Sequence, residues 1–230
     1  MPAASRPCWM ISTHLPDERA LRADPRLVKT WVHGWALARG MPLPVRDSGA
    51  LRVDVGLPDQ KARYIFSCCS EDVRRLAERI DEPYVFIKVC SPPGPVQGLL
   101  PSRWVIQRQG YMMTRMLEPP EDPHLPPGYR LAMESTPPRL TVSITDDRGD
   151  LAARGGSALV DGLAVFDQIR THEEHRRRGF ARAVMNALQG AAFRQGAMRG
   201  GLVATPEGRA LYDSMGWQLH SLYTRVEIPA

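Results

Sequence analysis

The stretch that decides the fold is Arg176-Arg177-Arg178-Gly179-Phe180-Ala181, which lies between a β-prone run and a helical run. Upstream, residues 163–169 are apolar and favour a strand, and downstream apolar residues recur at helical spacing until Gly196. A helix that begins near Gly179 has first amides without intrahelical partners. Three arginines oppose the helix dipole there unless a multiply charged anion binds. The hexapeptide alone leaves two interpretations open, an anion site or a solvated basic loop.

The charge distribution favours a local anion site over a broad nucleic-acid surface. The 230 residues carry a net charge of +5, with 17 Lys and Arg against 12 Asp and Glu in residues 1–118 and 13 against 13 in the remainder. The neutral half nevertheless concentrates three arginines at one point. No basic stripe with interleaved aromatic residues is present, so we expect no nucleic-acid partner.

Length and composition predict a soluble globular protein with one large domain or two small ones. No signal peptide or bilayer-spanning stretch is recognised, and we therefore expect a cytoplasmic protein without a membrane partner. The four cysteines have no C-x-x-C spacing, and we expect reduced, mostly buried thiols. They are Cys8, Cys68, Cys69 and Cys90.

Residues 1–116 are predicted to form a small α/β domain. Asp24-Pro25 and Gly40 bound a helix whose apolar face carries Trp31 and Trp35, a stripe more typical of a core than of a ligand pocket. Strands are expected at 51–55, 64–66, 84–90 and 111–115, a helix at 70–80 and a helical turn at 96–100. Residues 117–128 are rich in proline and predict a stiff linker.

Residues 129–230 are predicted to form a second domain. Four successive strands are expected at 129–133, 140–145, 151–160 and 163–171. A helix at 181–195, a buried strand at 200–204 and a helix from 205 to 215 follow. Residues 217–228 predict one long strand or two short ones.

Two motifs resemble the GCN5-related N-acetyltransferase (GNAT) family. Arg176, Gly179 and Ala181 match its acyl-coenzyme A signature, Gln/Arg-x-x-Gly-x-Gly/Ala, at a strand-to-helix junction. Downstream, Tyr212 and the pair Gly216-Trp217 are similar to the family's closing Tyr-x-x-x-Gly-aromatic pattern. The resemblance implies an α/β fold with a mixed, mostly antiparallel sheet and flanking helices.

The resemblance also implies where acetyl-coenzyme A binds. Amides around residues 177–182 would hold the pyrophosphate, and two splayed parallel strands would admit the pantetheine arm through main-chain hydrogen bonds. An amide near Ile169 could polarise the thioester carbonyl. The residues expected to bind the coenzyme are Ile169, Arg170, Thr171, Arg176, Arg177, Arg178, Gly179, Phe180, Ala181, Arg182 and Thr205.

Acetyl transfer needs two proton transfers, one from the attacking amine and one to the departing thiolate. By resemblance Tyr212 is the general acid that protonates the departing sulfur, with a packing tyrosine as the alternative. Asp167 alternates with Ile169 and Thr171, which predicts a shared strand face. Asp167 is then either the base or a carboxylate that orders the site or pairs with an arginine.

The sequence departs from the family where the acceptor pocket is normally built. Only residues 134–139 remain between two strands where the family places two helices. The N-terminal unit is the candidate replacement, packing across the gap as a degenerate or partial copy of the fold. The uncertain strand count after Gly216 also leaves room for strand exchange within a homodimer.

These observations predict an N-acetyltransferase that moves an acetyl group from acetyl-coenzyme A to a primary amine, of a small molecule or a peptide, by direct attack in a ternary complex. The alternative is a non-catalytic acyl-coenzyme A sensor or interaction module. His172-Glu173-Glu174-His175 lacks the His-Glu-x-x-His spacing of a metal site, and we expect no metal.

Overall fold

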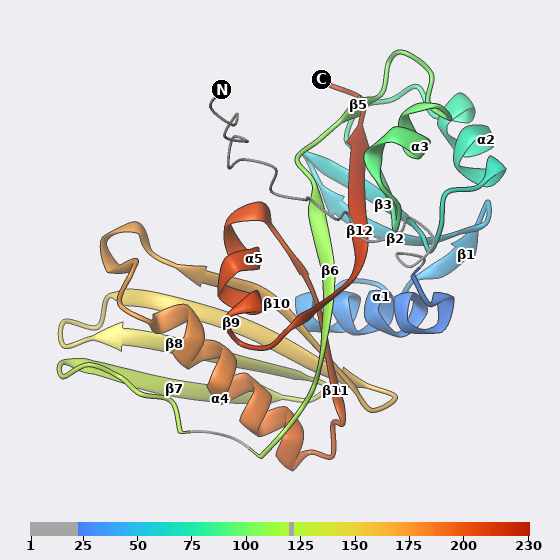
Figure 1. Cartoon of the computed structure of the whole chain (residues 1–230). Helices are drawn as coiled ribbons and strands as arrows, with labels where there is room; N and C mark the ends of the chain where they lie inside the picture. Colours follow the sequence, from blue (N-terminus) through green and yellow to red (C-terminus); the bar gives the residue numbers. More distant parts are fainter. Residues whose placement is uncertain (1–22, 120–121) are drawn as a thin grey trace, which may run out of the picture.

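The computed structural model describes residues 23–119 and 122–230 (Figure 1). The first half of the chain contains α1 (Pro25–Arg39), β1 (Val45–Asp47), β2 (Ala50–Leu57), β3 (Gln60–Phe66), α2 (Glu71–Arg79), β4 (Val85–Val89), α3 (Pro93–Gln97), β5 (Val105–Ile106) and β6 (Gly110–Met116). The second half contains β7 (Tyr129–Thr136), β8 (Arg139–Asp146), β9 (Leu151–Val160), β10 (Leu163–Thr171), the 3₁₀ helix η2 (Glu173–His175), α4 (Phe180–Arg194), β11 (Arg199–Ala204), α5 (Pro206–Asp213) and β12 (Gln218–Glu227).

The two halves share one mixed sheet. Its strand order is β1-β2-β3-β4-β12-β6-β11-β10-β9-β8-β7, and the short β5 pairs with β12 beside this path. The last strand of the chain, β12, therefore lies between β4 and β6, and β6 in turn pairs with β11. Strands are exchanged between the halves of a single chain, an arrangement that the sequence did not indicate.

The regular elements predicted from the sequence are nearly all present. β1 and β5 were not predicted, because runs of three and two residues carry almost no periodic signal. The short helix lies at Pro93–Gln97 rather than at 96–100. Residues 218–227 form one strand, with a register shift between Leu219 and Ser221.

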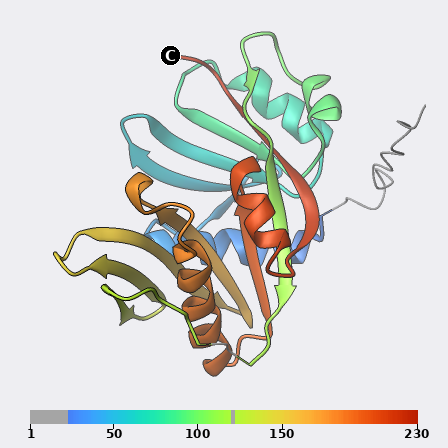
Figure 2. The same cartoon turned by 60° about the vertical axis from the view of Figure 1, so that its left-hand side comes forward.

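Helix α1 packs across the sheet on the face of β9 and β10 opposite α4 (Figures 1 and 2). Its ends follow the sequence signals, since the Asp24 carboxylate accepts the Arg26 amide at 2.8 Å and Gly40 is left-handed. Trp31 and Trp35 are buried in the core between α1 and the sheet, as the apolar stripe predicted. Helix α1 thus covers the face of β9 and β10 that α4 leaves free.

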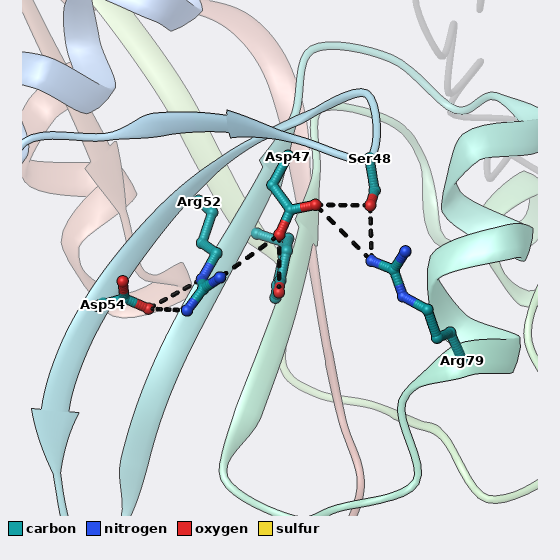
Figure 3. Close-up of polar contacts among 6 residues, drawn as sticks. Asp47, Ser48, Arg52, Asp54 and Arg79 are labelled. Carbon is teal, nitrogen blue, oxygen red and sulfur yellow. Dashed lines mark hydrogen bonds and ion pairs between the residues drawn. The ribbon is translucent and has the colours of Figure 1, made fainter.

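A polar network ties the β1–β2 turn to helix α2 (Figure 3). The Ser48 hydroxyl donates to Asp47 at 2.7 Å, and Arg79 donates to that hydroxyl at 2.6 Å. Arg52 bridges Asp54 at 2.7 Å and Asp47 at 3.6 Å. The Ser48 hydrogen bond, opposed by burial, lowers the pKa of Asp47. Because this network lies on an outer edge of the sheet, away from α4, we assign it a structural role.

No helix within the described ranges is both long and apolar enough to cross a membrane. Cys68, Cys69 and Cys90 are free thiols, and of these three only Cys90 is buried. The expectation of mostly buried thiols is therefore wrong for Cys68, which is exposed in the bend after β3. Cys8 lies outside the described residues.

We expect Gly34→Ala to destabilise the protein by about 1–3 kcal/mol, because the close fit of α1 on β10 leaves no room for a methyl group. A Cβ at Gly34 would lie 2.9 Å from the Cβ of Val165. Chemical denaturation measures the change in unfolding free energy. Gly94→Ala is the matched control, because a Cβ there meets nothing within 4 Å. Equal stability of the two variants would show that the fit is not tight.

Candidate active site

The sheet opens between the parallel strands β10 and β11. They are paired only at Leu163–Val165 with Arg199–Gly201, although β10 continues to Thr171 and β11 to Ala204. Beyond Val165, β11 pairs with β6 on its other side, whereas the β11-facing edge of β10 has no strand partner among the described residues. Unpaired main-chain groups at such an edge can bind an extended ligand as an additional strand.

A β-bulge in β10 overturns one expectation about side-chain direction. Gln168 has φ 57, and the register with β9 shifts between Asp167 and Arg170. Asp167 therefore reaches Arg39 of α1, whereas Ile169 packs against the core under α4. The prediction that Asp167 and Ile169 share a face was wrong, because the bulge breaks the two-residue alternation.

Free amides line the start of α4. Gly179 is the N-cap with φ 84, Arg177 is also left-handed with φ 64, and no side chain caps the helix. In the described chain, the amides of residues 177–182 donate no main-chain hydrogen bond, and the first donor in this helix is Ala183. A helix N-terminus with this many open donors fits a pyrophosphate group. The local geometry agrees with the anion site predicted from the hexapeptide.

The three arginines before α4 are all exposed but are held differently. Arg176 forms an ion pair with Glu173 at 3.0 Å. Arg178 donates to the Tyr129 hydroxyl at 2.7 Å. Arg177 forms no ion pair in the described residues. Arg177 is therefore the one of the three that can meet an incoming anion without giving up a partner.

The other expected coenzyme residues fall into two groups. Arg170 and Thr171 lie at the end of β10, opposite Arg154 and Ala153 of β9, and Ala181 lies half-buried in the first turn of α4. The remaining side chains already have other roles: Phe180 packs on Tyr129, Arg182 donates to Ser214, and Thr205 caps α5. Of this second group, Phe180 can contribute only its main chain.

Tyr212 of α5 is buried, with a relative exposure of 8 %, and packs against Trp217. Burial, together with the smaller effect of the negative charge of Asp167, raises the pKa of Tyr212 to about 12. The hydroxyl therefore keeps its proton at neutral pH.

Asp167 is held by Arg39, the last residue of α1. The Arg39 guanidinium donates through Nε to one carboxylate oxygen and through a terminal nitrogen to the other, at 3.3 Å for the second contact. Both side chains are about one-fifth exposed. Of the two roles left open by the sequence, the ion pair favours the one in which Asp167 orders the site.

His172, Glu174 and His175 bring one possible metal-ligand atom each within 4.8 Å of one another. The His175 Nδ1 atom also lies 3.1 Å from the Tyr129 hydroxyl. His172 and Glu174 are exposed, and exposed groups of this kind are common without a bound ion. The expectation of no metal remains a prediction.

Comparison with known proteins agrees with this geometry. The sequence model of the acetyltransferase (GNAT) family matches residues 110–217, from the start of β6 to the Trp217 that precedes β12. Residues 110–217 thus carry the sequence pattern of the acetyltransferase (GNAT) family. No curated protein matches the sequence.

Solved structures of the family share the fold over most of the chain. A GCN5-related N-acetyltransferase from Kribbella flavida superposes with a TM-score of 0.65 at 16 % identity, covering 89 % of this chain and 95 % of its own. A putative GNAT-family acetyltransferase from Novosphingobium aromaticivorans gives 0.56 at 17 %, covering 88 % and 99 %. A tandem GNAT protein from the clavulanic acid biosynthesis pathway gives 0.52 at 14 %, covering 81 % and 82 %. The shared fold thus includes the N-terminal half.

Several residues at the site were not identified from the sequence. Arg39, Arg63 and Lys88 come from the N-terminal half. Arg39 donates to Asp167 directly. Burial lowers the pKa of Arg63 and of Lys88, and the negative charge of Asp167 opposes that shift. Lys88 carried a readable signal, because it interrupts the otherwise apolar run 84–90 of a predicted buried strand. Gln168 carried no such signal, since nothing in its residue type indicates a bulge.

We expect Arg177→Gln to weaken acetyl-coenzyme A binding about three- to tenfold, because one charged contact to a phosphate is lost. Isothermal titration calorimetry measures the affinity. Arg194→Gln is the matched control, since Arg194 is an exposed arginine in the last turn of α4, the helix that Arg177 precedes. An equal effect of the two substitutions would mean that only the net charge matters.

Proposed function

We propose that this protein is an N-acetyltransferase that moves an acetyl group from acetyl-coenzyme A to a primary amine by direct attack in a ternary complex. The observation that carries the proposal is the open edge of β10, which leads to the free amides of residues 177–182. Tyr212, a buried tyrosine of α5, carries the hydroxyl group that would serve as proton donor. The family match makes acyl-coenzyme A the expected ligand.

The residues present fit the coenzyme. The unpaired amides before and within the first turn of α4 and the neighbouring arginines would hold its phosphates. Main-chain groups of Ile169 and Thr171, on the edge that β11 leaves open, would hold the pantetheine arm. When bound, acetyl-coenzyme A supplies the acetyl group as an activated thioester.

Tyr212 is proposed as the donor to the departing sulfur. Its raised pKa, about 12, keeps the hydroxyl protonated and able to donate. The alternative role, packing alone, is compatible with its contact to Trp217. Removing the hydroxyl while keeping the ring separates the two roles, since phenylalanine preserves the packing.

Asp167 is proposed as a positioning residue. Both of its carboxylate oxygens accept from Arg39, which leaves the carboxylate poorly placed to remove a proton directly. The pair fastens the end of α1 to the bulged part of β10 and so orders the opening. The proton of the attacking amine would then pass to solvent or to a water molecule in the site.

We further propose that the N-terminal half is a degenerate copy of the family fold. Strands β2 and β3, helix α2, strand β4, helix α3 and strand β6 repeat the order of β9 through β12. Strands β3 and β4 are parallel, like β10 and β11, but are paired from Ala62–Phe66 along Val85–Val89. Helix α2 begins with Glu71 and Asp72 instead of arginines. This half therefore lacks both features of a coenzyme site.

The fold likeness to a tandem GNAT protein supports this interpretation at the level of architecture. In the proposed arrangement the second half binds the coenzyme, and the first half forms a wall of the acceptor site. The competing proposal is an acyl-coenzyme A sensor that uses the same opening without chemistry. A sensor would release no thiol with any amine.

We expect Tyr212→Phe to lower kcat about 100-fold while acetyl-coenzyme A binds as in the parent, because a proton donor typically contributes at least this factor. An assay of free coenzyme A thiol with a library of amines measures the rate, and calorimetry measures binding. Parent-like turnover in the variant would remove Tyr212 from the mechanism.

The pH dependence gives an independent check of the Tyr212 assignment. Because burial raises its pKa to about 12, the hydroxyl stays protonated as the pH rises and ionises only above the usual range of tyrosine. We therefore expect the ratio of parent to Tyr212→Phe rates to stay constant between about pH 7 and pH 10. A ratio that collapses within this interval would contradict a donor with a raised pKa.

A further inference from the structure

Three basic side chains from neighbouring strands meet on the sheet face that α1 covers. They are Arg63 of β3, Lys88 of β4 and Arg225 of β12, and we call them the basic cluster. Val85, Ile87 and Val89 pack into the opposite core beneath α2 and α3, so the alternation of β4 directs Lys88 to this face. Lys88 lies directly opposite Arg225 in the antiparallel pair. Like charges directly opposite each other repel, and the repulsion destabilises the sheet unless a negative partner compensates it.

The basic cluster has too few negative partners. Arg225 pairs with Glu227 at 2.5 Å, and Asp167 is already bonded by Arg39. Arg63 has only the neutral Gln60 side chain, at 2.7 Å, and the Trp35 ring, 4.4 Å from its guanidinium carbon. The buried Nε atoms of Arg63 and Arg225 have no acceptor within the described chain.

Lys88 is the extreme case. Its side chain is buried, with a relative exposure of 9 %, and it forms no ion pair or side-chain hydrogen bond with the described residues. The side-chain nitrogen lies 5.7 Å from the centre of the Tyr223 ring, in a cation–π contact. Burial, reinforced by Arg63 and Arg225, lowers the pKa of Lys88 well below its usual range. A buried lysine of this kind gives up its proton readily, and its charged form is costly unless a ligand supplies the missing negative charge.

Two members of the cluster, Lys88 and Arg225, line a cavity beside the opened strands. The cavity, about 280 Å³, is also lined by Tyr223, by residues 203–205 and by Glu207. The Glu207 carboxylate pairs with Arg108 of the same lining. Residues 203–205 are the end of β11 and the cap of α5, the helix that carries Tyr212. The cavity therefore lies between strands β4 and β12 and the end of β11 that is not paired with β10.

We propose that the acceptor amine carries an anionic group, a carboxylate or a phosphate, and that Lys88 and Arg225 bind this group in the cavity. The inference rests on the proposed function and names its substrate class. Binding of the anion keeps Lys88 charged and gives the cluster its missing negative partner. The Tyr223 ring supports the Lys88 side chain, and the amine end of the acceptor extends toward the opening between β10 and β11.

Matched pairs of acceptors test the substrate class. The probes are glycine, β-alanine and 4-aminobutyrate against their amides, for a carboxylate at three distances, and phosphoethanolamine against ethanolamine, for a phosphate. At fixed acetyl-coenzyme A, we expect at least one anionic probe to exceed its neutral partner about tenfold or more in kcat/KM. Neutral partners that react as well as every anionic probe would overturn the proposal.

Lys88→Met tests the residue. We expect KM for the preferred anionic probe to rise about tenfold or more, with kcat within about threefold and acetyl-coenzyme A affinity unchanged. Lys88→Arg is expected to recover part of the loss, and Lys29→Met, at an exposed lysine of α1, to change nothing. An unchanged KM in Lys88→Met would overturn the assignment.

Two further measurements distinguish a binding role of Lys88 from a structural one, and the failure of this proposal from the failure of the proposed function. The thermal midpoint of Lys88→Met is expected to equal or exceed that of the parent, because an apolar side chain replaces an unpartnered buried cation. If no amine is acetylated, the proposed function fails, and calorimetry with the same anionic probes in the presence of coenzyme A still decides the binding site. Binding that Lys88→Met abolishes supports the site; no binding, or equal binding, overturns it.

Discussion

The loss of pairing between β10 and β11 after Val165 is the constraint on which the rest of the structure depends. An edge inside a sheet leaves main-chain donors and acceptors without partners, which costs free energy unless a ligand or water meets them. Here β11 is held on its other side by β6, and β10 carries a bulge at Gln168 beyond the last paired residue. The opening is thus built into the covalent and hydrogen-bonded frame, and α4 directs its free amides to one end of it.

The exchange of the last strands determines what surrounds that opening. Because β6 pairs with β11 and β12 pairs with β4, each half completes the sheet of the other. The N-terminal half therefore cannot move away without breaking a continuous ladder. Helix α1 strengthens the connection, since it packs on β9 and β10 while Arg39 holds Asp167. The basic cluster is brought to the site by the same exchange.

Local signals accounted for most of the elements and for the phosphate-binding end of the site. Asp24 and Gly40 marked the ends of α1, and Gly179 marked the start of α4, because caps and left-handed turns depend on neighbouring residues. That Ile169 lies on the opposite face from Asp167 could not be predicted, because the bulge at Gln168 reverses every later side chain of the strand. Lys88 could have been found, since a lone lysine in an apolar strand needs an explanation.

The sequence by itself determined the order of the elements, the family signature at Arg176–Ala181 and the position of Tyr212 after it. Those features depend on residue types at short spacing. Tertiary structure alone decided that β6 pairs with β11 and β12 with β4. It also decided that Arg39 pairs with Asp167 and that Lys88 faces a cavity next to the opened strands. These contacts join residues more than 80 positions apart, and pairing at that range is governed by the packing of whole strands, which no local pattern records.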